Sequence, residues 1–203
     1  METKEMKVAL MIMAAGESKR FGGCKQLSQV SDDHSLLSHA IEQAVNAQIG
    51  PVFVVTGRWH NEIDQVQQQG AFATVPLLHC PDWAQGLGRS IAYGVEILAP
   101  DYNAILITLA DQVALTSEDF HRFVELASKE HIVCSHYNGK RGVPVLFPAC
   151  YFPQLTQLNG EHGARSLLRG EQFPIREITL PHAKYDIDTP QALAEFKKIA
   201  GHF

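Results

Sequence analysis

Three continuous runs of hydrophobic residues divide the chain into regular segments: 8–13 (VALMIM), 51–56 (PVFVVT) and 104–109 (AILITL). Apolar runs of about four to eight residues that end in glycine or polar residues are typical of strands buried on both faces. We therefore predict strands over these ranges. Shorter strands are predicted over 75–79, 131–137 and 143–147, the last two joined by the turn NGKRG.

Between these runs, hydrophobic residues recur at helical spacing. In 35–47, for example, Leu37, Ile41 and Ala44 fall on one helix face. The pattern predicts helices over 35–47, 60–69, 88–98, 116–130, 164–170 and 191–200. Thr116 or Ser117 is expected to cap the fourth of these helices, and Pro190 to begin the last.

Strands that alternate with helices predict a mostly parallel sheet with helices on both faces. The two strands around NGKRG can pair antiparallel, which makes the sheet mixed. We expect a single α/β domain over residues 1–203, a Rossmann-like three-layer sandwich. Ligands of such open sheets bind at the carboxyl ends of the strands. A site is therefore expected after Ala14, from Gly57 onward and around Asp111.

Composition and charge narrow the class of partner. The 203 residues carry a formal charge of −5, with a pI near 6.0, so a nucleic-acid-binding module with a basic face is not expected. The start METKEMK and the short apolar run after it suit neither a secretion signal nor a membrane-spanning helix. The four cysteines form no CxxC pair, and we expect reduced thiols in a cytoplasmic protein.

The loop AAGESKRFGGCK follows the first predicted strand and combines small residues with two cations. It matches neither the dinucleotide fingerprint GxGxxG nor the phosphate loop GxxxxGK[ST]. Because the residues of this loop are small, its backbone N–H groups can approach anionic oxygens closely. Arg20 can bind two oxygens with its guanidinium, and Lys25 adds a point charge. This combination suits a polyphosphate ligand. The alternative is a glycine-rich connection with two solvated cations. The candidate nucleotide-binding residues are Ala14, Ala15, Gly16, Ser18, Arg20, Gly22 and Lys25.

Acidic residues occupy two further positions of interest. Asp111 directly follows the strand at 104–109 and is well placed to hold Mg²⁺, which takes one or two carboxylates together with phosphate oxygens and water. In YDIDTP, Asp186 and Asp188 alternate with Ile187, so an extended backbone points both to one side. The alternative makes Asp111 a plain loop carboxylate and lets Asp188 or Thr189 cap the last helix. For Asp186 both interpretations stay open.

The segment PDWAQGLGRS places Gly86 and Gly88 in a loop before a predicted helix, with Ser90 near its first turn. A flexible loop and a helix amino terminus can bind a base edge or an anion. Gly86 and Ser90 are therefore candidate nucleotide contacts. The alternative is a glycine loop followed by a serine N-cap.

Several of these stretches occur in the order found in one enzyme family. AAGESKRFGGCKQL resembles the signature loop of nucleotidyltransferases with the nucleotide-diphospho-sugar transferase fold, LADQ resembles their second motif, and DIDTP their closing motif. PDWAQGLGRS, GKRGVPVLFP and GEHGARSLL are similar to segments of the molybdenum cofactor cytidylyltransferases. The resemblance runs from Val8 to about Leu193. Val113 stands where relatives usually have proline, a change that removes no ligand.

This resemblance implies nucleotidyl transfer, in which an acceptor phosphate attacks the α-phosphorus of a nucleoside triphosphate and pyrophosphate leaves. It implies catalytic roles for Arg20, Lys25 and Asp111, and binding of Mg²⁺, or Mn²⁺ in its place, by Asp111 and Asp188. No covalent enzyme intermediate is expected.

The same resemblance has consequences for the acceptor. In relatives, the positions of Gly142 and Pro144 shape a wall of the acceptor pocket. Arg165 is expected to face either an anionic acceptor or solvent, and the resemblance does not decide between the two.

CTP and molybdopterin are the substrates that the resemblance favours. Related guanylyltransferases more often carry AGG and a closing asparagine, where this chain has Ala14-Ala15-Gly16 and Asp188. The alternatives are GTP-dependent guanylyl transfer to molybdopterin, transfer to another small phosphorylated acceptor, and a nucleotide-binding sensor or chaperone without turnover. A molybdoenzyme or its chaperone is a candidate partner, whereas nucleic acid and membrane are not expected.

Overall fold

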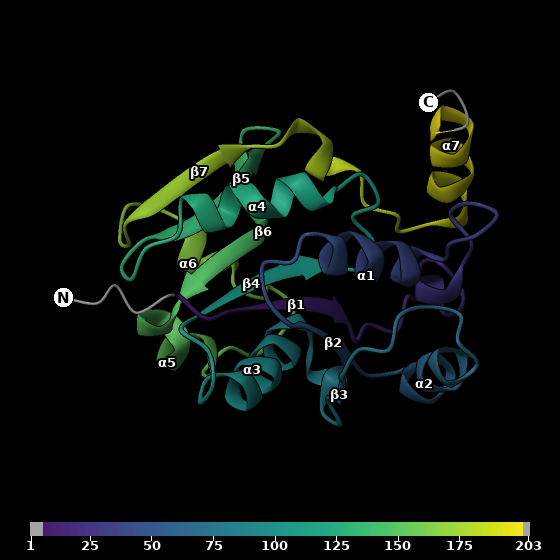
Figure 1. The fold of residues 1–203 in the computed structure, drawn as a ribbon, viewed down its shortest axis with the longest axis horizontal. Helices are drawn as coiled ribbons and strands as arrows, with labels where there is room; N and C mark the ends of the chain where they lie inside the picture. Colours follow the sequence, from purple (N-terminus) through teal and green to yellow (C-terminus); the bar gives the residue numbers. More distant parts are fainter. Residues whose placement is uncertain (1–5, 201–203) are drawn as a thin grey trace.

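The computed structural model describes residues 6–200, and its strands form one sheet in the order β3-β2-β1-β4-β6-β5-β7 (Figure 1). Neighbouring strands run parallel except for β6, which is antiparallel to β4 and to β5. The expected mostly parallel, mixed sheet of an α/β domain is therefore confirmed. The strands are β1 (Val8–Ala14), β2 (Val52–Thr56), β3 (Leu77–His79), β4 (Ala104–Leu109), β5 (Ile132–Tyr137), β6 (Lys140–Pro148) and β7 (Ile175–Thr179).

The helices lie between the strands, as the hydrophobic spacing predicts. Two of them begin with a reciprocal capping box, formed by Ser35 with Ser38 and by Thr116 with Asp119. Thr116 is thus the cap of its helix. The helices are α1 (Leu36–Asn46), α2 (His60–Gln68), α3 (Leu87–Leu98), α4 (Ser117–Glu125), α5 (Phe152–Leu155), α6 (Arg165–Leu168) and α7 (Pro190–Ala200), with 3₁₀ turns η1 (Lys25–Leu27), η2 (Trp83–Gln85), η3 (Ala149–Tyr151) and η4 (Pro181–Lys184).

The sheet is buried on both faces, and each face has its own cluster of hydrophobic side chains. On one face, Leu10 and Ile12 of β1 pack with side chains of α1 and α4 such as Leu37 and Phe120. On the other face, Met11 packs with side chains of α3, α5 and α6. Figure 1 shows α1 above β1 and β4, α4 across the part of the sheet near β5 and β6, and α3 and α5 below β1. Because alternate residues of β1 enter opposite clusters, the whole strand is apolar.

Some elements differ from the predicted ones. β7 and α5 were not expected, because β7 is an edge strand of sequence IREIT in which only Ile178 is buried, and α5 has only four residues. The predicted helix over 116–130 ends at Glu125. β6 begins at Lys140 and not at Val143, because Asn138 and Gly139 alone make the turn, with φ of 49° and 68°.

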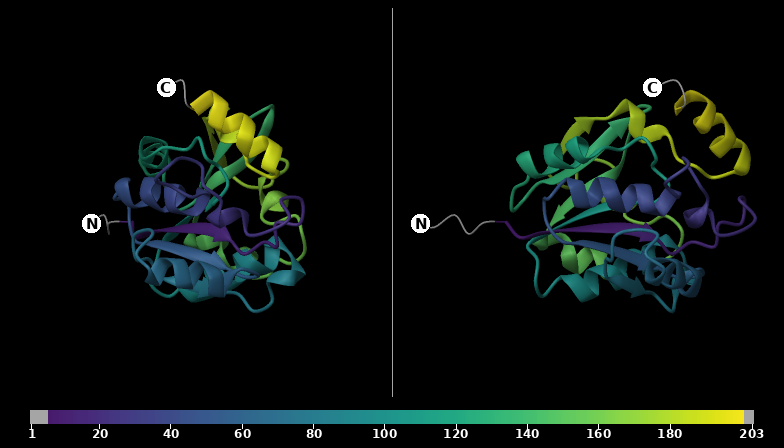
Figure 2. Two further views of the ribbon diagram at one scale, coloured as in Figure 1. Left: turned by 90° about the vertical axis from the view of Figure 1, so that its right-hand side faces the viewer. Right: turned by 45° about the vertical axis from the view of Figure 1, so that its right-hand side comes forward.

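Helix α7 lies beside the loop that follows β1 (Figure 2). A small cluster joins them, in which buried Val113 and Ile187 are packed against Phe21, Leu193 and Phe196. The opening loop, the segment after β4 and the carboxyl-terminal tail therefore meet at the end of the sheet where β1 and β4 finish.

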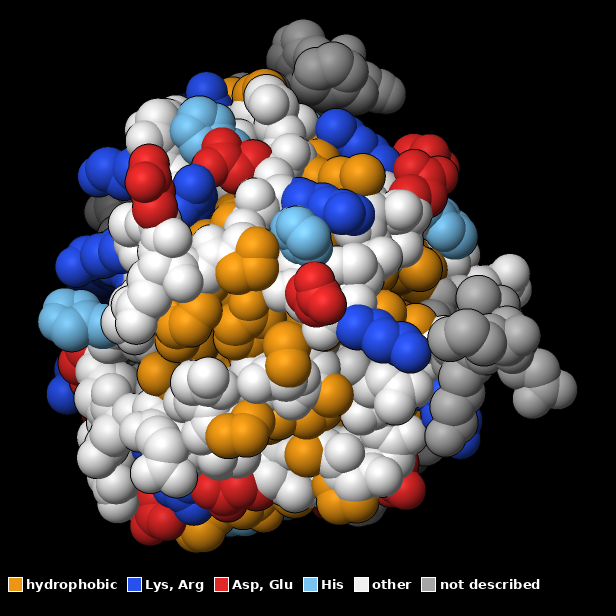
Figure 3. Space-filling view, turned by 90° about the vertical axis from the view of Figure 1, so that its left-hand side faces the viewer, with side chains coloured by type: hydrophobic (Ala, Val, Ile, Leu, Met, Phe, Trp, Pro, Cys, Tyr) orange, Lys and Arg blue, Asp and Glu red, His pale blue; other side chains and the backbone are white. Residues whose placement is uncertain are grey.

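The opposite end of the molecule has a different surface. Figure 3 shows hydrophobic side chains gathered in its centre, with most of the charged side chains around them. Within residues 6–200, none of the helices combines the length and the apolar character needed to cross a membrane.

Candidate active site

The loop after β1 folds back on itself through two residues with left-handed backbone. Ser18 has φ of 60° and Gly22 has φ of 80°. The backbone N–H groups of Phe21 and Gly22 donate to the carbonyl oxygen of Ser18 at 2.9 and 3.1 Å. Glycine adopts this conformation without strain, which explains the residue type at Gly22.

Gln26 ties the two ends of this loop together. Its side chain is buried, Nε2 donates to the carbonyl oxygen of Ala14 at 3.2 Å, and Oε1 accepts from Ser18 Oγ at 3.4 Å. The sequence analysis did not single out Gln26, because one glutamine in a glycine-rich loop forms no recognisable pattern. Its position beside Lys25 was the only available signal.

A second anchor joins the end of β4 to the carboxyl-terminal tail. Gln112 forms an isolated antiparallel bridge with Asp186, and the backbone N–H of Ile187 donates to the carbonyl oxygen of Asp111 at 3.1 Å. The buried side chain of Gln112 also donates to the carbonyl oxygens of Val143, at 2.9 Å, and Ala183, at 3.0 Å. In the sequence, Gln112 is recognisable only as part of LADQ, and nothing there points to its role as an anchor.

These anchors bring Lys25, Asp111 and Asp188 together, although they come from three distant parts of the chain. Lys25 Nζ lies 2.5 Å from Asp111 Oδ2, 3.0 Å from Asp188 Oδ1 and 3.1 Å from the carbonyl oxygen of Ile187. Arg20 Nη2 donates to Asp188 Oδ2 at 2.8 Å. The convergence expected of the catalytic and metal-binding candidates is therefore present as one hydrogen-bonded cluster.

The charges in this cluster stabilise one another. Burial disfavours the ammonium of Lys25, but the carboxylates of Asp111 and Asp188 outweigh it, so the pKa of Lys25 lies above its usual value. Burial also acts against the carboxylate of Asp188, but Lys25 and Arg20 outweigh it and lower the pKa of Asp188. Both shifts favour the charged form, so Lys25 is a cation and Asp188 an anion at neutral pH.

The other residues of the tail have separate roles. Asp186 contributes its backbone to the bridge with Gln112; burial and the charge of Asp111 raise the pKa of the Asp186 carboxyl. Thr189 Oγ1 accepts from the backbone N–H of Ala192 at 3.1 Å. Thr189, rather than Asp188, thus caps α7, and this leaves Asp188 free to face Lys25.

One atom indicates that the carboxylates fit a divalent cation. Asp111 Oδ1 is buried and has no hydrogen-bond partner among the described residues, a costly arrangement that a bound cation would relieve. Within residues 6–200 there is no group of three or more histidine, cysteine or acidic side chains that could hold a metal. Asp111 and Asp188 alone match the one or two protein carboxylates of a magnesium site that is completed by phosphate oxygens and water.

A cavity of about 390 Å³ opens beside this cluster. Trp83 and Glu161, which the sequence did not single out, also line it. Three of the predicted nucleotide contacts do not line this cavity. Ala14 is buried, and Arg20 and Gly22 lie farther along the loop. The predicted contacts that do line it are Ala15, Gly16, Ser18, Lys25, Gly86, Ser90 and Asp111.

The two candidates from the middle of the chain also have structural roles. Gly86 has φ of 104°, and a Cβ there would come within 2.5 Å of the backbone of Gly160, so only glycine fits. Ser90 is buried inside α3, and its hydroxyl interacts with the thiol of Cys80. Both lie at the cavity wall, and the close approach of Gly160 is by itself enough to explain the glycine at position 86.

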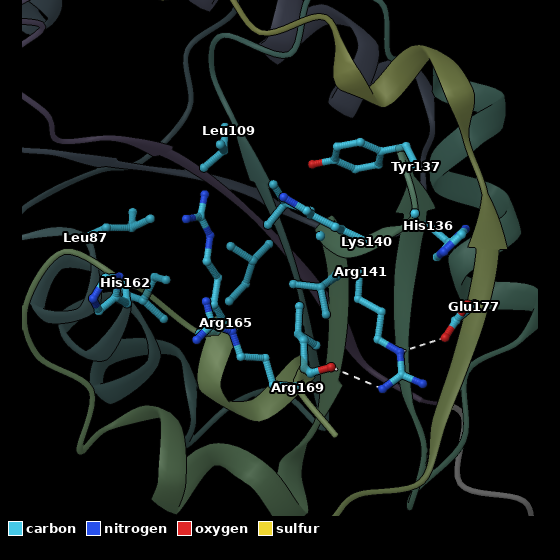
Figure 4. A pocket seen from close by; sticks show the side chains of 18 of the residues that line it. Leu87, Leu109, His136, Tyr137, Lys140, Arg141, His162, Arg165, Arg169 and Glu177 are labelled. Carbon is cyan, nitrogen blue, oxygen red and sulfur yellow. Dashed lines mark hydrogen bonds and ion pairs between the residues drawn. The ribbon is translucent and has the colours of Figure 1, made fainter. Parts of the chain in front are cut away.

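A second cavity, of about 690 Å³, lies between α6 and the β5–β6 hairpin (Figure 4). Its lining includes Gly142 and Arg165, together with Lys140 and Arg169, but not Pro144. Leu87 and Leu109 line both cavities, so the two adjoin. A Cβ at Gly142 would come within 2.6 Å of the hydroxyl oxygen of Tyr137, so a larger residue in this wall would require the Tyr137 side chain to move.

Arg141 holds one side of the larger cavity in place. Its Nε donates to Glu177 Oε1 at 2.6 Å, and Nη1 donates to the carbonyl oxygens of Leu168, at 3.1 Å, and Gly170, at 2.8 Å. Leu168 is the last residue of α6, and Gly170 lies two residues beyond it. Arg141 therefore fixes the end of α6 and the turn that follows.

The segment that Arg141 holds carries two more arginines. Figure 4 shows Arg165 extending along the cavity toward Leu109. No carboxylate within residues 6–198 pairs with Arg165 or Arg169. The larger cavity therefore presents unpaired positive charge over an apolar floor, an arrangement that suits an anion with an apolar body.

The adjoining cavities and the cluster of Lys25, Asp111 and Asp188 lie near the carboxyl ends of parallel strands, where open α/β sheets bind their ligands. Residues 10–177 match the family model of the MobA-like NTP transferase domain, and the chain belongs to this family. It is thus a nucleotidyltransferase.

Individual relatives show how far the likeness extends. The chain is 30% identical over 194 residues to the purine catabolism protein PucB of Bacillus subtilis, covering 89% of this chain and 91% of that protein. It is 28% identical over 181 residues to the molybdenum cofactor cytidylyltransferase of Escherichia coli, covering 89% and 90%. A nucleotidyl transferase from Methanothermobacter shares the fold, with a TM-score of 0.81, 17% identity and coverage of 98% and 99%.

Proposed function

We propose that this protein transfers CMP from CTP to the phosphate of molybdopterin, with release of pyrophosphate. The observation that carries the proposal is the contact of Lys25 Nζ with both Asp111 and Asp188, at 2.5 and 3.0 Å. The choice of CTP and molybdopterin draws support from the 28% identity to the Escherichia coli cytidylyltransferase and from the motifs AAG and DIDTP.

The chain's own residues suit this reaction. An acceptor phosphate is already anionic, so catalysis depends on positioning and charge neutralisation rather than on a strong base. Lys25 stabilises the α-phosphoryl group, while Arg20 and the N–H groups of the loop after β1 hold the β- and γ-phosphates. Mg²⁺, or Mn²⁺ in its place, held by Asp111 and Asp188, supplies further neutralisation of the triphosphate when bound.

The larger cavity is the proposed site of the acceptor. Gly142 and Val143 form part of its wall, and Arg165 and Arg169 supply positive charge. Because Leu87 and Leu109 line both cavities, an acceptor there lies next to a nucleotide in the smaller one. This assigns Arg165 to an anionic acceptor rather than to solvent.

A pyrophosphate assay tests the proposed reaction. The protein is incubated with Mg²⁺, molybdopterin and each of the four nucleoside triphosphates in turn, and released pyrophosphate is measured. We expect release with CTP. Release with GTP alone would make the protein a guanylyltransferase, and release with no nucleotide would favour a nucleotide-binding sensor or chaperone without turnover.

A second candidate is transfer to a different small phosphorylated acceptor. The Bacillus subtilis relative, at 30% identity, is a purine catabolism protein, and its name does not mention the molybdenum cofactor. Pyrophosphate release with CTP and another phosphorylated heterocycle, but not with molybdopterin, would favour this candidate.

The proposed product also implies a recipient. A molybdoenzyme or its chaperone would accept the nucleotide-bearing cofactor, in the cytoplasm. The four cysteines are unpaired, which agrees with a reducing compartment.

A further inference from the structure

Lys25 lies between the two carboxylates that are proposed to hold a divalent cation. Its Nζ is 2.5 Å from Asp111 Oδ2 and 3.0 Å from Asp188 Oδ1. Arg20 Nη2 lies 2.8 Å from the other carboxylate oxygen of Asp188. In this structure, both cations proposed for the triphosphate are therefore paired with carboxylates proposed for the metal.

These ion pairs compete with the nucleotide complex. Lys25 and Arg20 occupy three of the four carboxylate oxygens of Asp111 and Asp188, and they leave only Asp111 Oδ1 without a hydrogen bond for a divalent cation to use. A cation between the same carboxylates also repels Lys25 strongly at such short range. Lysine has a flexible four-carbon stem, so Nζ can leave the carboxylates while the backbone of η1 stays in place.

We propose that Lys25 is a placeholder for the divalent cation: it neutralises Asp111 and Asp188 in the ligand-free protein and moves to the triphosphate when the cation binds. The cation and the nucleotide consequently bind cooperatively. The inference rests on the proposed function, because it takes the metal ligands and the triphosphate contacts from there.

The charges of the cluster support this exchange. Lys25, Arg20, Asp111 and Asp188 together carry no net charge, so the ligand-free cluster has little net attraction for an anion. A divalent cation raises the total by two positive charges and releases Lys25, which favours a triphosphate. By reciprocity, a bound triphosphate that attracts Lys25 frees the carboxylates for the cation.

Removing the positive charge of Lys25 is therefore expected to strengthen metal binding, although Lys25 is proposed as a catalytic residue. The probe is Mn²⁺, titrated into the full chain and followed by the loss of the paramagnetic resonance signal of free Mn²⁺. The titration is made with and without CTP, in the absence of any acceptor. The variant is Lys25→Met. The matched control is Lys129→Met, which makes the same charge change at an exposed residue before β5, at the other end of the strands.

Without nucleotide, Lys25→Met is expected to bind Mn²⁺ roughly tenfold more tightly than the wild type, and Lys129→Met to bind it as the wild type does. CTP is expected to tighten Mn²⁺ binding about 5- to 150-fold in the wild type, the usual span of coupling between two sites. That effect is expected to shrink in Lys25→Met. Lys25→Gln keeps a hydrogen-bond donor but lacks the charge, and we expect it to bind Mn²⁺ as tightly as Lys25→Met does. It replaces Lys25→Met if the methionine variant does not fold.

The possible failures can be told apart. In one outcome, CTP tightens Mn²⁺ binding in the wild type, but Lys25→Met and Lys25→Gln bind Mn²⁺ no more tightly than the wild type does. This result overturns the placeholder role and leaves the proposed function standing. Absence of Mn²⁺ binding by the wild type, with or without CTP, overturns the metal site and the inference together. Asp188→Asn, which removes a ligand, is expected to weaken Mn²⁺ binding under both conditions.

Discussion

Gln112 and Asp186 pair through an isolated antiparallel bridge, and this contact holds the carboxyl-terminal tail beside the end of β4. The side chain of Gln112 reinforces it by donating to the carbonyl oxygens of Val143 and Ala183. Asp188 reaches Lys25 because the tail is held here. The arrangement of the site thus depends on a residue outside the predicted catalytic set.

Replacing Gln112 with alanine should therefore affect both the fold and the site. Two buried carbonyl groups lose their donor, and the expected cost is about 1–3 kcal/mol in the free energy of unfolding. Urea unfolding measures this loss, and pyrophosphate release by the folded variant should also fall. Gln65→Ala, at an exposed position of α2, is the control. A Gln112→Ala protein as stable and as active as the control would contradict the anchoring role.

Lys25→Ala should retain the fold but lose most of the turnover. The ammonium is proposed to stabilise charge that develops on the α-phosphoryl group, and removing one such group typically lowers kcat by about 10²–10³. Steady-state pyrophosphate release is the measurement, with Lys129→Ala as the control. Unchanged turnover in Lys25→Ala would rule out the proposed mechanism.

Arg141→Met should weaken acceptor binding and leave nucleotide binding intact. Arg141 secures the end of α6, which carries Arg165 and Arg169, but it lies outside the smaller cavity. The expected result is a KM for the acceptor raised on the order of tenfold, comparable to the loss of one charge-assisted hydrogen bond, with little change in the KM for CTP.

Arg176→Met is the matched control for this variant. Arg176 lies in the edge strand β7 and, like Arg141, donates to a backbone carbonyl, namely that of Leu126 at 2.8 Å. It does not line either cavity. An equal rise in the acceptor KM for both variants, or a rise in the KM for CTP, would show that Arg141 has only a general structural role.

The free energy of unfolding should depend on pH through His39. Burial lowers the pKa of His39, and the charge of His34 lowers it further. A hydrogen bond with the Val113 backbone raises this pKa but does not outweigh burial. The unfolded chain then binds the proton more readily, so stability falls as the pH drops through about 6.5 and levels off below the folded-state pKa. Urea unfolding between pH 8 and 5, roughly the range that spans this titration, measures the slope.

His39→Gln should flatten this dependence, because glutamine keeps a hydrogen-bonding side chain but does not titrate. The same substitution at His121, an exposed residue of α4, should leave the slope unchanged. Equal slopes in wild type and His39→Gln would show that the acid sensitivity has another origin.

Much of the fold can be predicted because its signals are local. The run at 104–109 coincides with β4, and α3 and α7 begin within one residue of their predicted positions. In each case the hydrophobic period along a short segment records which face is buried. The sequence of β7 shows no such hydrophobic pattern, because an edge strand with one buried residue has no apolar run.

The candidate site divides in the same way. Small residues and cations in the opening loop and Asp111 after a buried strand are visible in the sequence, because residue type and position suggest their chemistry. Asp188 is visible through the resemblance of DIDTP to the closing motif of the family. Gln26 and Gln112 were not visible as anchors, because their hydrogen-bond partners are backbone carbonyls that any residue can supply.

The order of residues within short stretches is enough to predict the long buried strands and the side chains that lie at their carboxyl ends. Three features are seen only in the folded chain: β6 lies between β4 and β5, the tail packs against Gln112, and Arg141 holds the end of α6. Those contacts join residues far apart in the chain, and hydrogen bonds between single polar groups leave no periodic pattern in the sequence.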